Sequence, residues 1–330
     1  MIAVRGLVLA GSLAAFLSGT AAAQTAPATE AEPGPATSAE EVRRPPPIQP
    51  QGFRSPEEGF AAMAGAARAH DEQRLLRVLG EQARRLVRSG DPAADRAARL
   101  RFATAYAEQA EILRPSPDRA LLQVGHDRWP LPIPMVRRGG IWRFDAREGV
   151  QELVDRRIGR NELDTIEVLR EIVRAQDEYA RTTGRRGAFS AYARRFFSTP
   201  GTHDGLYWPS AAGEPESPLG PLMAAAAGGY GAAPSRGDEP RPFHGYLFRI
   251  LESQGPSAPG GAMDYVVNGQ MIGGFGVIAT PARYGVSGIQ TFLVSHAGVI
   301  YQRNLGPETA QIARSIASFD PEQGWERVAE

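Results

Sequence analysis

The stretch NELDTIEVLREIVRAQDEYART, residues 161–182, decides the fold. Its apolar side chains recur at helical spacing and charged side chains occupy the positions between them, which is the pattern of an amphipathic helix. We expect a first helical stretch from Glu148 that breaks at Gly159, and this second helix after it. Asn161 is a favourable residue to cap the start of this helix, and Gly184 is placed to end it. We expect the helix to pack one stripe against a sheet. The predicted stripe is Leu163, Ile166, Leu169, Ile172, Val173 and Tyr179.

The C-terminal third of the chain supplies the sheet for this helix. Asn268-Gly269 lies between two apolar runs, which predicts a tight hairpin because both residues tolerate positive φ. Short apolar runs separated by glycines predict an antiparallel meander around it. The predicted elements are strands over 245–251, 275–279, 290–295 and 299–303 and a closing helix over 307–318.

The residues before this helix predict a smaller α+β domain. Ser55 and Asp91 each precede a proline at the start of an apolar-periodic run, so helices are expected from 55 to 113. Gly139-Gly140 predicts a hairpin. The strands are expected over 121–124, 131–136 and 141–144. The order of helices and strands is similar to the small cone-shaped NTF2-like domains. The predicted class is α+β, with an N-terminal domain over 53–147 and a C-terminal helix-plus-sheet domain over 148–330.

The first residues have the three parts of a signal peptide. A positive start, an apolar run over 7–17 and small residues after it predict cleavage between Ala23 and Gln24, so that residues 1–23 are removed. The apolar run is shorter than the ~20 residues that a membrane span needs, so we expect no span after removal. Residues 24–52 are rich in proline and alanine and predict a disordered tether. We expect a periplasmic protein or, alternatively, a secreted one.

Composition excludes several chemistries. The sequence has no cysteine, and all 37 basic residues are arginine. The chain therefore offers no disulfide, thiolate zinc site or iron–sulfur cluster, and no lysine for a P-loop or a Schiff base. The formal net charge is +0, which gives no reason to expect nucleic-acid binding. His203 and His244, the closest histidines along the chain, are too far apart for a local metal motif. We expect no metal and no cofactor.

Several longer strings resemble one known family. They are IGRNEL (158–163), STPG (198–201), DGLYWP (204–209), SPLGPL (217–222), QGP (254–256), APGG (258–261), DYVVNG (264–269) and YGVSG (284–288). From about residue 53 to its end, the chain resembles a bacterial exported family catalogued as domain of unknown function 2950. The resemblance implies export and one shared fold, and it brings no catalytic residues.

The C-terminal half also resembles the globular domains of type IV pilins and pseudopilins. The likeness lies in a helix that ends near Tyr179, followed by apolar strand segments separated by glycine and proline. It implies one helix laid on an antiparallel sheet. A pilin helix begins with a long apolar half that lies in the membrane, and this helix does not. The likeness therefore concerns the fold and not fibre assembly.

Two groups of residues are candidates for a site. The segment from Thr199 to Pro221 is too rich in proline and glycine for helix or strand, and long loops of this kind are often functional. Its candidate interaction residues are Asp204, Tyr207 and Trp208. The alternative is that the two aromatic rings fill the core beneath the loop. The second group is a polar junction between the domains, for which we prefer structural contacts over anion binding. Its residues are Arg157, Arg160, Asn161 and Glu162.

No catalytic motif stands out, so the leading hypothesis is a non-catalytic module that binds a periplasmic protein partner or supports the envelope. One alternative is a hydrolase acting on an envelope polymer, in which His203, Asp204 or His296 would meet distant carboxylates in one cleft. Another alternative is a small-ligand binder with a cavity near Trp129 and Trp142. Whether the chain is an enzyme stays open at this point, with the balance against it.

Overall fold

The computed structural model describes residues 47–210, 216–222, 241–322 and 324–329. The predicted signal peptide, its cleavage site at Ala23 and Gln24, and the tether as far as residue 46 lie outside the described residues. Residues 47–52, expected to belong to the tether, instead lie against the folded chain. The backbone oxygen of Ile48 accepts a hydrogen bond from Glu81 (2.8 Å), and the backbone nitrogen of Gln51 donates to Arg77 (2.9 Å).

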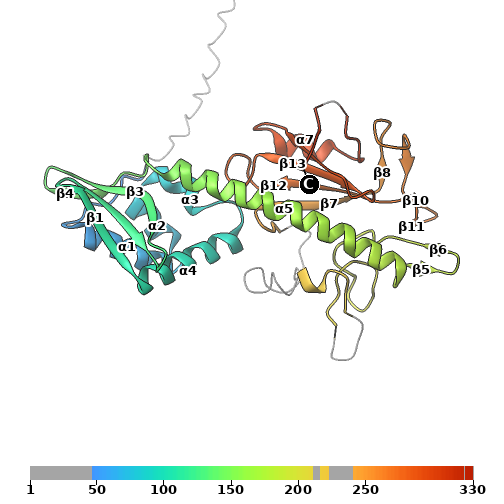
Figure 1. Cartoon of the computed structure of the whole chain (residues 1–330), viewed down its shortest axis with the longest axis horizontal. Coiled ribbons are helices and arrows are strands. Elements are labelled where there is room, and N and C mark those ends of the chain that lie inside the picture. Colours follow the sequence, from blue (N-terminus) through green and yellow to red (C-terminus); the bar gives the residue numbers. More distant parts are fainter. Residues whose placement is uncertain (1–46, 211–215, 223–240, 323, 330) are drawn as a thin grey trace, which may run out of the picture. The chain divides into compact units, whose positions relative to one another are not determined.

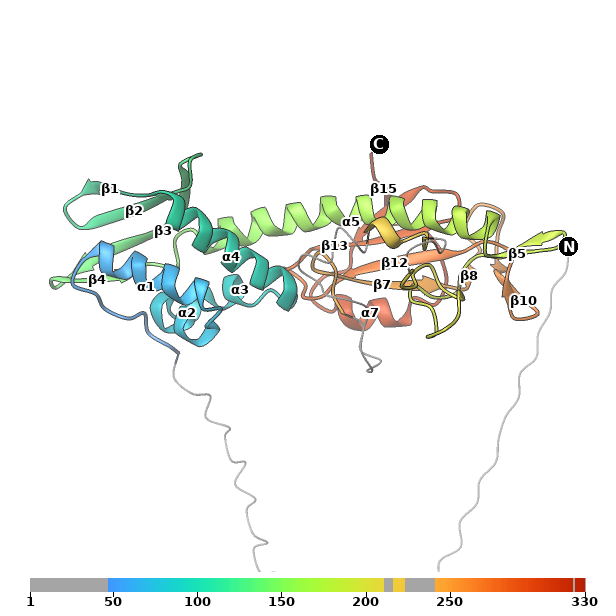
Figure 2. The same ribbon diagram turned by 90° about the horizontal axis from the view of Figure 1, so that it is seen from below.

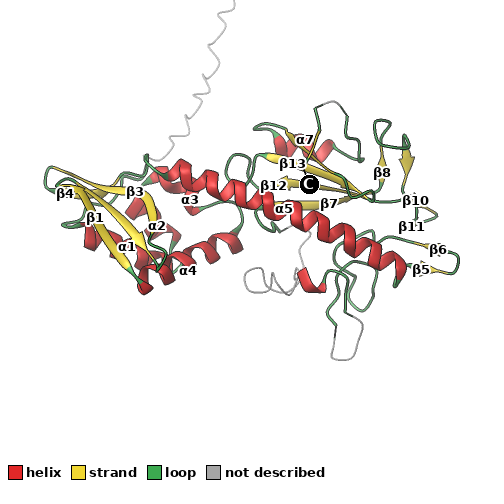
Figure 3. Ribbon diagram, viewed as in Figure 1, coloured by secondary structure: helices red, strands yellow, loops and turns green. Residues whose placement is uncertain are grey.

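The chain first forms a group of short helices. Ser55 accepts a hydrogen bond from the backbone nitrogen of Glu58 (3.3 Å), and Asp91 accepts from those of Ala93 and Ala94, which confirms both predicted helix starts. The helices are α1 (Pro56–Arg68), α2 (Glu72–Leu79), the 3-10 turn η1 (Glu81–Ala83), α3 (Arg84–Val87) and α4 (Pro92–Glu108). Their apolar side chains cover one face of the sheet that follows (Figure 3).

This sheet has four antiparallel strands in the order β1-β2-β3-β4. The strands are β1 (Ala110–Ser116), β2 (Arg119–Val124), β3 (Trp129–Arg138) and β4 (Ile141–Phe144). Gly139 and Gly140 have φ of 57° and 77° and join Arg138 directly to Ile141, which confirms the predicted two-residue turn. The prediction was wrong for Ala110–Leu113, which form an edge strand and not the end of a helix.

One long helix then runs through both halves of the chain. α5 (Val150–Arg181) is continuous, so the predicted break at Gly159 and the capping role of Asn161 were both wrong. Val154 and Ile158, in the first turns of α5, are part of the first core. The other residues of this core come mainly from α1–α4 and β2–β4. The later turns of α5, from Val168 to Tyr179, belong to a second core. Figure 1 shows α5 beginning beside the elements of the first half and running along the second sheet.

The inner face of α5 differs from the predicted stripe at one position. Leu163 is 68% exposed, whereas the polar side chains of Asn161 and Thr165 are buried. The remaining predicted residues lie on the inner side, where Leu169, Ile172 and Tyr179 are buried. The cap of the helix is Thr182, and two residues later the backbone nitrogen of Gly184 donates to the oxygen of Tyr179 (2.7 Å).

The second sheet is an antiparallel meander with the strand order β15-β14-β13-β12-β7. Its strands are β7 (Tyr246–Leu251), β12 (Gly276–Pro281), β13 (Gln290–Ser295), β14 (Ile300–Asn304) and β15 (Glu326–Arg327). α5 covers one face through the second core, and the helix α7 (Thr309–Ser315) lies against the other face, where Ile278, Leu293 and Phe319 are buried (Figure 2). The predicted helix on an antiparallel sheet is confirmed, and the sheet has a further helix behind it.

Three short hairpins extend this half of the chain. Asn268 and Gly269 have φ of 51° and 78° and connect two paired strands, which confirms the predicted Asn-Gly turn. The hairpin strands are β5 (Arg185–Arg186) with β6 (Phe189–Ser190), β8 (Ser253–Gln254) with β9 (Met263–Asp264), and β10 (Val266–Val267) with β11 (Gln270–Met271). The α+β class is confirmed, while the finer likenesses to NTF2-like and pilin domains stay predictions. Within the described residues, no helix is both long enough and apolar enough to cross a membrane.

Candidate functional site

The segment 195–208, here called the aromatic loop, is an ordered structure. Residues 195–198 run beside residues 205–207, and the two stretches exchange backbone hydrogen bonds. Ser198 donates to Tyr207 (2.8 Å), Tyr207 to Phe196 (2.8 Å) and Leu206 to Arg195 (3.1 Å). Gly205 lies where a Cβ would come within 2.7 Å of the backbone of Phe197, so the close approach of the two stretches requires glycine there.

Asp204 organises the turn of the aromatic loop. Its carboxylate accepts hydrogen bonds from the backbone nitrogen of Thr199 (2.7 Å) and from the hydroxyls of Thr199 (2.9 Å) and Thr202 (2.8 Å). Burial opposes ionisation of this carboxyl, but the hydrogen bonds and the charge of Arg195 outweigh burial and lower the pKa of Asp204. Asp204 is therefore ionised, and both of its carboxylate oxygens accept hydrogen bonds that hold the turn of the loop in place.

The aromatic side chains of this loop divide into two kinds. Trp208 is 5% exposed and belongs to the second core, with its ring stacked on that of His203 at 4.3 Å, so the expected alternative of a ring that fills the core describes its position. Tyr207 is half-buried, and its ring meets that of Phe197 edge-to-face at 5.9 Å. Phe197 is 37% exposed. Sequence reasoning missed Phe197, which precedes the segment chosen for its proline and glycine.

The structure brings three of the four predicted junction residues together on α5. Arg157 donates hydrogen bonds to the backbone oxygens of Arg85 (2.6 Å), Leu86 (3.0 Å) and Val286 (3.1 Å). Asn161 donates to the oxygen of Ser287 (2.8 Å). Glu162 accepts from the backbone nitrogens of Ile289 (2.8 Å) and Gln290 (3.0 Å). Arg160 is exposed on the same helix and is not brought into this cluster.

The contacts of Arg157 are reciprocated by two further arginines. Arg85, in α3, donates a hydrogen bond to the backbone oxygen of Gly285 (2.6 Å). Arg283 donates in the opposite direction, to the backbone oxygen of Arg88 (2.6 Å). Burial lowers the pKa of Arg157, which the charge of Asp95 opposes and the charges of Arg283 and Arg85 reinforce. The three guanidinium groups thus join the segment 85–88 to the segment 283–286.

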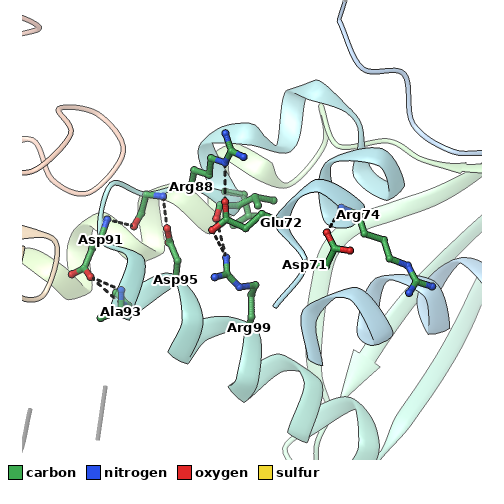
Figure 4. A network of polar contacts seen from close by, with 12 residues as sticks. Asp71, Glu72, Arg74, Arg88, Asp91, Ala93, Asp95 and Arg99 are labelled. Carbon is green, nitrogen blue, oxygen red and sulfur yellow. Dashed lines mark hydrogen bonds and ion pairs between the residues drawn. The ribbon is translucent and has the colours of Figure 1, made fainter. Parts of the chain in front are cut away.

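Three carboxylates lie at or near this junction, of which the sequence analysis considered only Asp91, as a helix start (Figure 4). Asp91 caps α4 with one oxygen, and its other oxygen accepts from the backbone nitrogen of Gly245 (2.9 Å). Asp95 accepts from the backbone nitrogen of Ser89 (2.9 Å), and burial raises its pKa despite that hydrogen bond. Glu72 accepts from Arg88 (2.9 Å) and Arg99 (3.4 Å).

Two glycines allow close approaches at the junction, Gly245 to α5 and Gly288 to the ring of Tyr246. A Cβ on Gly245 would lie 2.4 Å from the side-chain nitrogen of Asn161, and a Cβ on Gly288 would lie 2.1 Å from the hydroxyl of Tyr246. That hydroxyl is buried and donates to the oxygen of Gln290 (2.9 Å), and burial together with nearby Glu162 raises its pKa. The polar groups of the junction are mostly bonded to backbone, so the junction joins chain segments and does not present open groups to a substrate.

The residues named for a hydrolase take part in separate contacts. His203 stacks on Trp208, while the ring of His296 lies edge-to-face against Tyr265 and Phe275. A further histidine, His244, contacts the carboxylate of Asp164 (3.0 Å). The hydroxyl of Ser287 accepts from the backbone nitrogen of Arg283 (2.9 Å) within a turn. Among the residues that the structure describes, no cluster of histidine and acidic side chains could hold a metal ion.

The N-terminal half has two shallow hollows. One, of about 310 Å³, lies on the sheet face opposite the helices and includes Leu121, Pro130 and Glu148 in its lining. The other, of about 340 Å³, lies between α1 and α4 beside the exposed Leu100. Trp129 is 36% exposed, and Trp142 is buried with Arg137 over its ring at 5.6 Å. Neither tryptophan is among the residues that line these two hollows, and the small-ligand cavity near them stays a prediction.

The geometry defines a two-core α+β chain with one shared helix, a polar junction and an ordered aromatic loop. The chain belongs to the family described as protein of unknown function DUF2950, whose model matches residues 50–328. The resemblance seen in the sequence motifs is thereby confirmed. No curated protein and no solved structure matches the chain.

Proposed function

We propose that this chain is an exported, non-catalytic module of the bacterial envelope that binds a protein partner through the aromatic loop. The observation that carries the proposal is the pair Phe197 and Tyr207, two aromatic rings in contact on the surface of an ordered loop. Aromatic side chains supply much of the energy of protein interfaces, and a loop that is already ordered loses little entropy on binding.

The hydrogen bonds of Asp204 support this role because they hold the loop in shape before any partner arrives. Tyr207 lies partly on the second core and partly at the surface, and the buried Trp208 anchors the next position of the chain. Export rests on the signal peptide expected at residues 1–23, and a periplasmic address is proposed on the same basis.

The proposal is tested by capture from periplasmic extract on the immobilised mature chain. Tyr207→Ala and Phe197→Ala should each lower the yield of a specific partner at least about tenfold, as hot-spot truncations do. Leu163→Ala is the matched control, because it removes an exposed apolar side chain from the rigid helix α5. Circular dichroism must first show that the variants are folded. Equal yields from the wild type, both loop variants and the control would contradict the proposal.

A further inference from the structure

The strand β7 has one backbone edge that faces away from the sheet. The nitrogen of Ala282 donates to the oxygen of Gly245 (2.9 Å), which identifies that opposed pair as hydrogen-bonded. Hydrogen-bonded pairs alternate along an antiparallel ladder. In the register of β7 with β12, Leu247, Arg249 and Leu251 therefore direct their backbone groups toward β12, and Phe248 and Ile250 direct theirs outward.

Both ends of this outer edge are occupied. Tyr246 exchanges two backbone hydrogen bonds with Phe243 (2.8 and 3.0 Å), and the oxygen of Glu252 accepts from the nitrogen of Tyr265 (2.8 Å). Between these ends, Phe248 and Ile250 make no outward backbone hydrogen bond within the described chain. We call their two nitrogens and two oxygens the β7 slot. The stretch between the two occupied ends, residues 247–251, is about 17 Å long, which matches an extended segment of five residues.

The other sheet edges are covered or interrupted. The edge strand β1 contains Pro115, which cannot donate to a further strand. β4 is paired along its outer side by Phe53, whose backbone exchanges hydrogen bonds with Trp142 (2.8 and 2.9 Å). β15, the other edge strand of the second sheet, is only two residues long and offers little edge to a further strand. Proteins commonly protect edges in these ways, so an open edge stands out as a place for another strand.

The side chains beside the β7 slot specify what would fit it. Phe248 and Ile250 are half-buried against the second core and give the slot an apolar side. Arg249 lies on the opposite face and is exposed. Its guanidinium donates to the backbone oxygens of Ala313 (2.9 Å) and Ile316 (2.7 Å), and it forms no ion pair with a carboxylate of the described residues. A strand added here would place one side chain beside this positive charge.

We propose that the β7 slot binds a short extended segment of a partner protein by strand addition, with an acidic residue opposite Arg249 and an apolar residue on either side of it. The two apolar residues exchange backbone hydrogen bonds with Phe248 and Ile250, and the acidic side chain pairs across the strand with Arg249. A second copy of this chain fits less well, because two-fold pairing of Phe248 with Ile250 would put Arg249 opposite Arg249. This proposal concerns the edge of β7 and the earlier one concerns the aromatic loop, and neither proposal requires the other.

Amide hydrogen exchange measured by NMR on the mature chain tests this inference. In the free protein, the amides of Phe248 and Ile250 should exchange at least about tenfold faster than those of Leu247 and Arg249, because only the latter are bonded within the sheet. The probe is the synthetic peptide acetyl-Thr-Val-Glu-Val-Thr-amide. Adding the peptide should slow amide exchange at Phe248 and Ile250. The Tyr207→Ala variant should bind the peptide as well as the wild type does.

Two matched peptides identify the contacts. Replacing the glutamate of the peptide by arginine should weaken binding about two- to fivefold, the range of a cross-strand charge pair. Methylating the backbone nitrogens of both valines should abolish binding, because it removes the donors that face the slot. Slow exchange at Phe248 and Ile250 in the free protein, or no change with peptide, would overturn the proposal. Concentration-dependent dimerisation that protects the same two amides would assign the slot to a second copy instead.

Discussion

Replacing Arg157 by methionine tests whether the junction carries the stability of the whole chain. The substitution keeps much of the apolar stem but removes three hydrogen bonds, to the backbone oxygens of Arg85, Leu86 and Val286. Each such bond contributes about 1 kcal/mol net, so the expected loss in the free energy of unfolding is about 3 kcal/mol. Two of the lost bonds reach the segment before α4 and one reaches the segment before β13, so both halves of the chain should lose stability together.

The assay is urea unfolding of the purified chain, followed by circular dichroism and by tryptophan fluorescence. Arg156→Met is the matched control, because Arg156 is the neighbouring residue on α5 and pairs only with Glu152 one turn away at the surface. Exposed pairs of this kind contribute about 0.3–0.5 kcal/mol. The reasoning is refuted if Arg157→Met and Arg156→Met lose the same stability, or if the two probes report separate transitions in the wild type and no change in either for Arg157→Met.

Three further substitutions follow from the structure. Gly159→Ala should stabilise the chain by about 0.5–1 kcal/mol in thermal or urea unfolding, since Gly159 is inside α5 with open space around its Cα, and a lower stability would contradict this. Gly288→Ala should cost about 1–3 kcal/mol, because the new methyl group would meet the buried hydroxyl of Tyr246, and wild-type stability would show that the strand can shift. Burial raises the pKa of Asp95 in the folded chain. The stability that the protonated carboxyl contributes is therefore fully present below pH 3.8, its usual pKa, and is lost as the pH rises through the raised pKa. Asp95→Asn should therefore gain stability relative to the wild type as pH rises from 3 to 7, and a gap that is constant with pH would refute the raised pKa.

Local turn chemistry explains which parts of the fold could be predicted. Gly139-Gly140 and Asn268-Gly269 form the expected turns because positive φ at two adjacent residues is a local requirement that few other residues meet. Ala110–Leu113 were misassigned because their apolar residues suit a helix as well as a strand, and only pairing with β2 decides between the two.

Tertiary contacts explain the errors on α5. A glycine at 159 suggested a break, but Val154 and Ile158 pack in one core and Val168 and Leu169 in the next, and these contacts outweigh the cost of about 1 kcal/mol for glycine within a helix. Leu163 is apolar and exposed, while Asn161 is polar and buried, because Asn161 finds an acceptor at Ser287. A partner so distant along the chain leaves no signal in the local sequence.

The candidate site was predictable to a similar degree. Arg157, Asn161 and Glu162 were selected as a junction from their crowding in the sequence, and they do lie together against the segment 285–290. The contribution of Asp91 could not be seen, because one oxygen serves as an ordinary helix cap and only the other reaches Gly245. Phe197 escaped notice because its importance comes from its contact with Tyr207.

The most direct test of a binding role for the aromatic loop is photo-crosslinking in living cells that produce the protein. A photoreactive phenylalanine analogue placed at position 207 should give a discrete adduct with one envelope protein, and the same analogue at the exposed position 163 should not. Absence of an adduct at position 207, or the same adducts from both positions, would contradict the account.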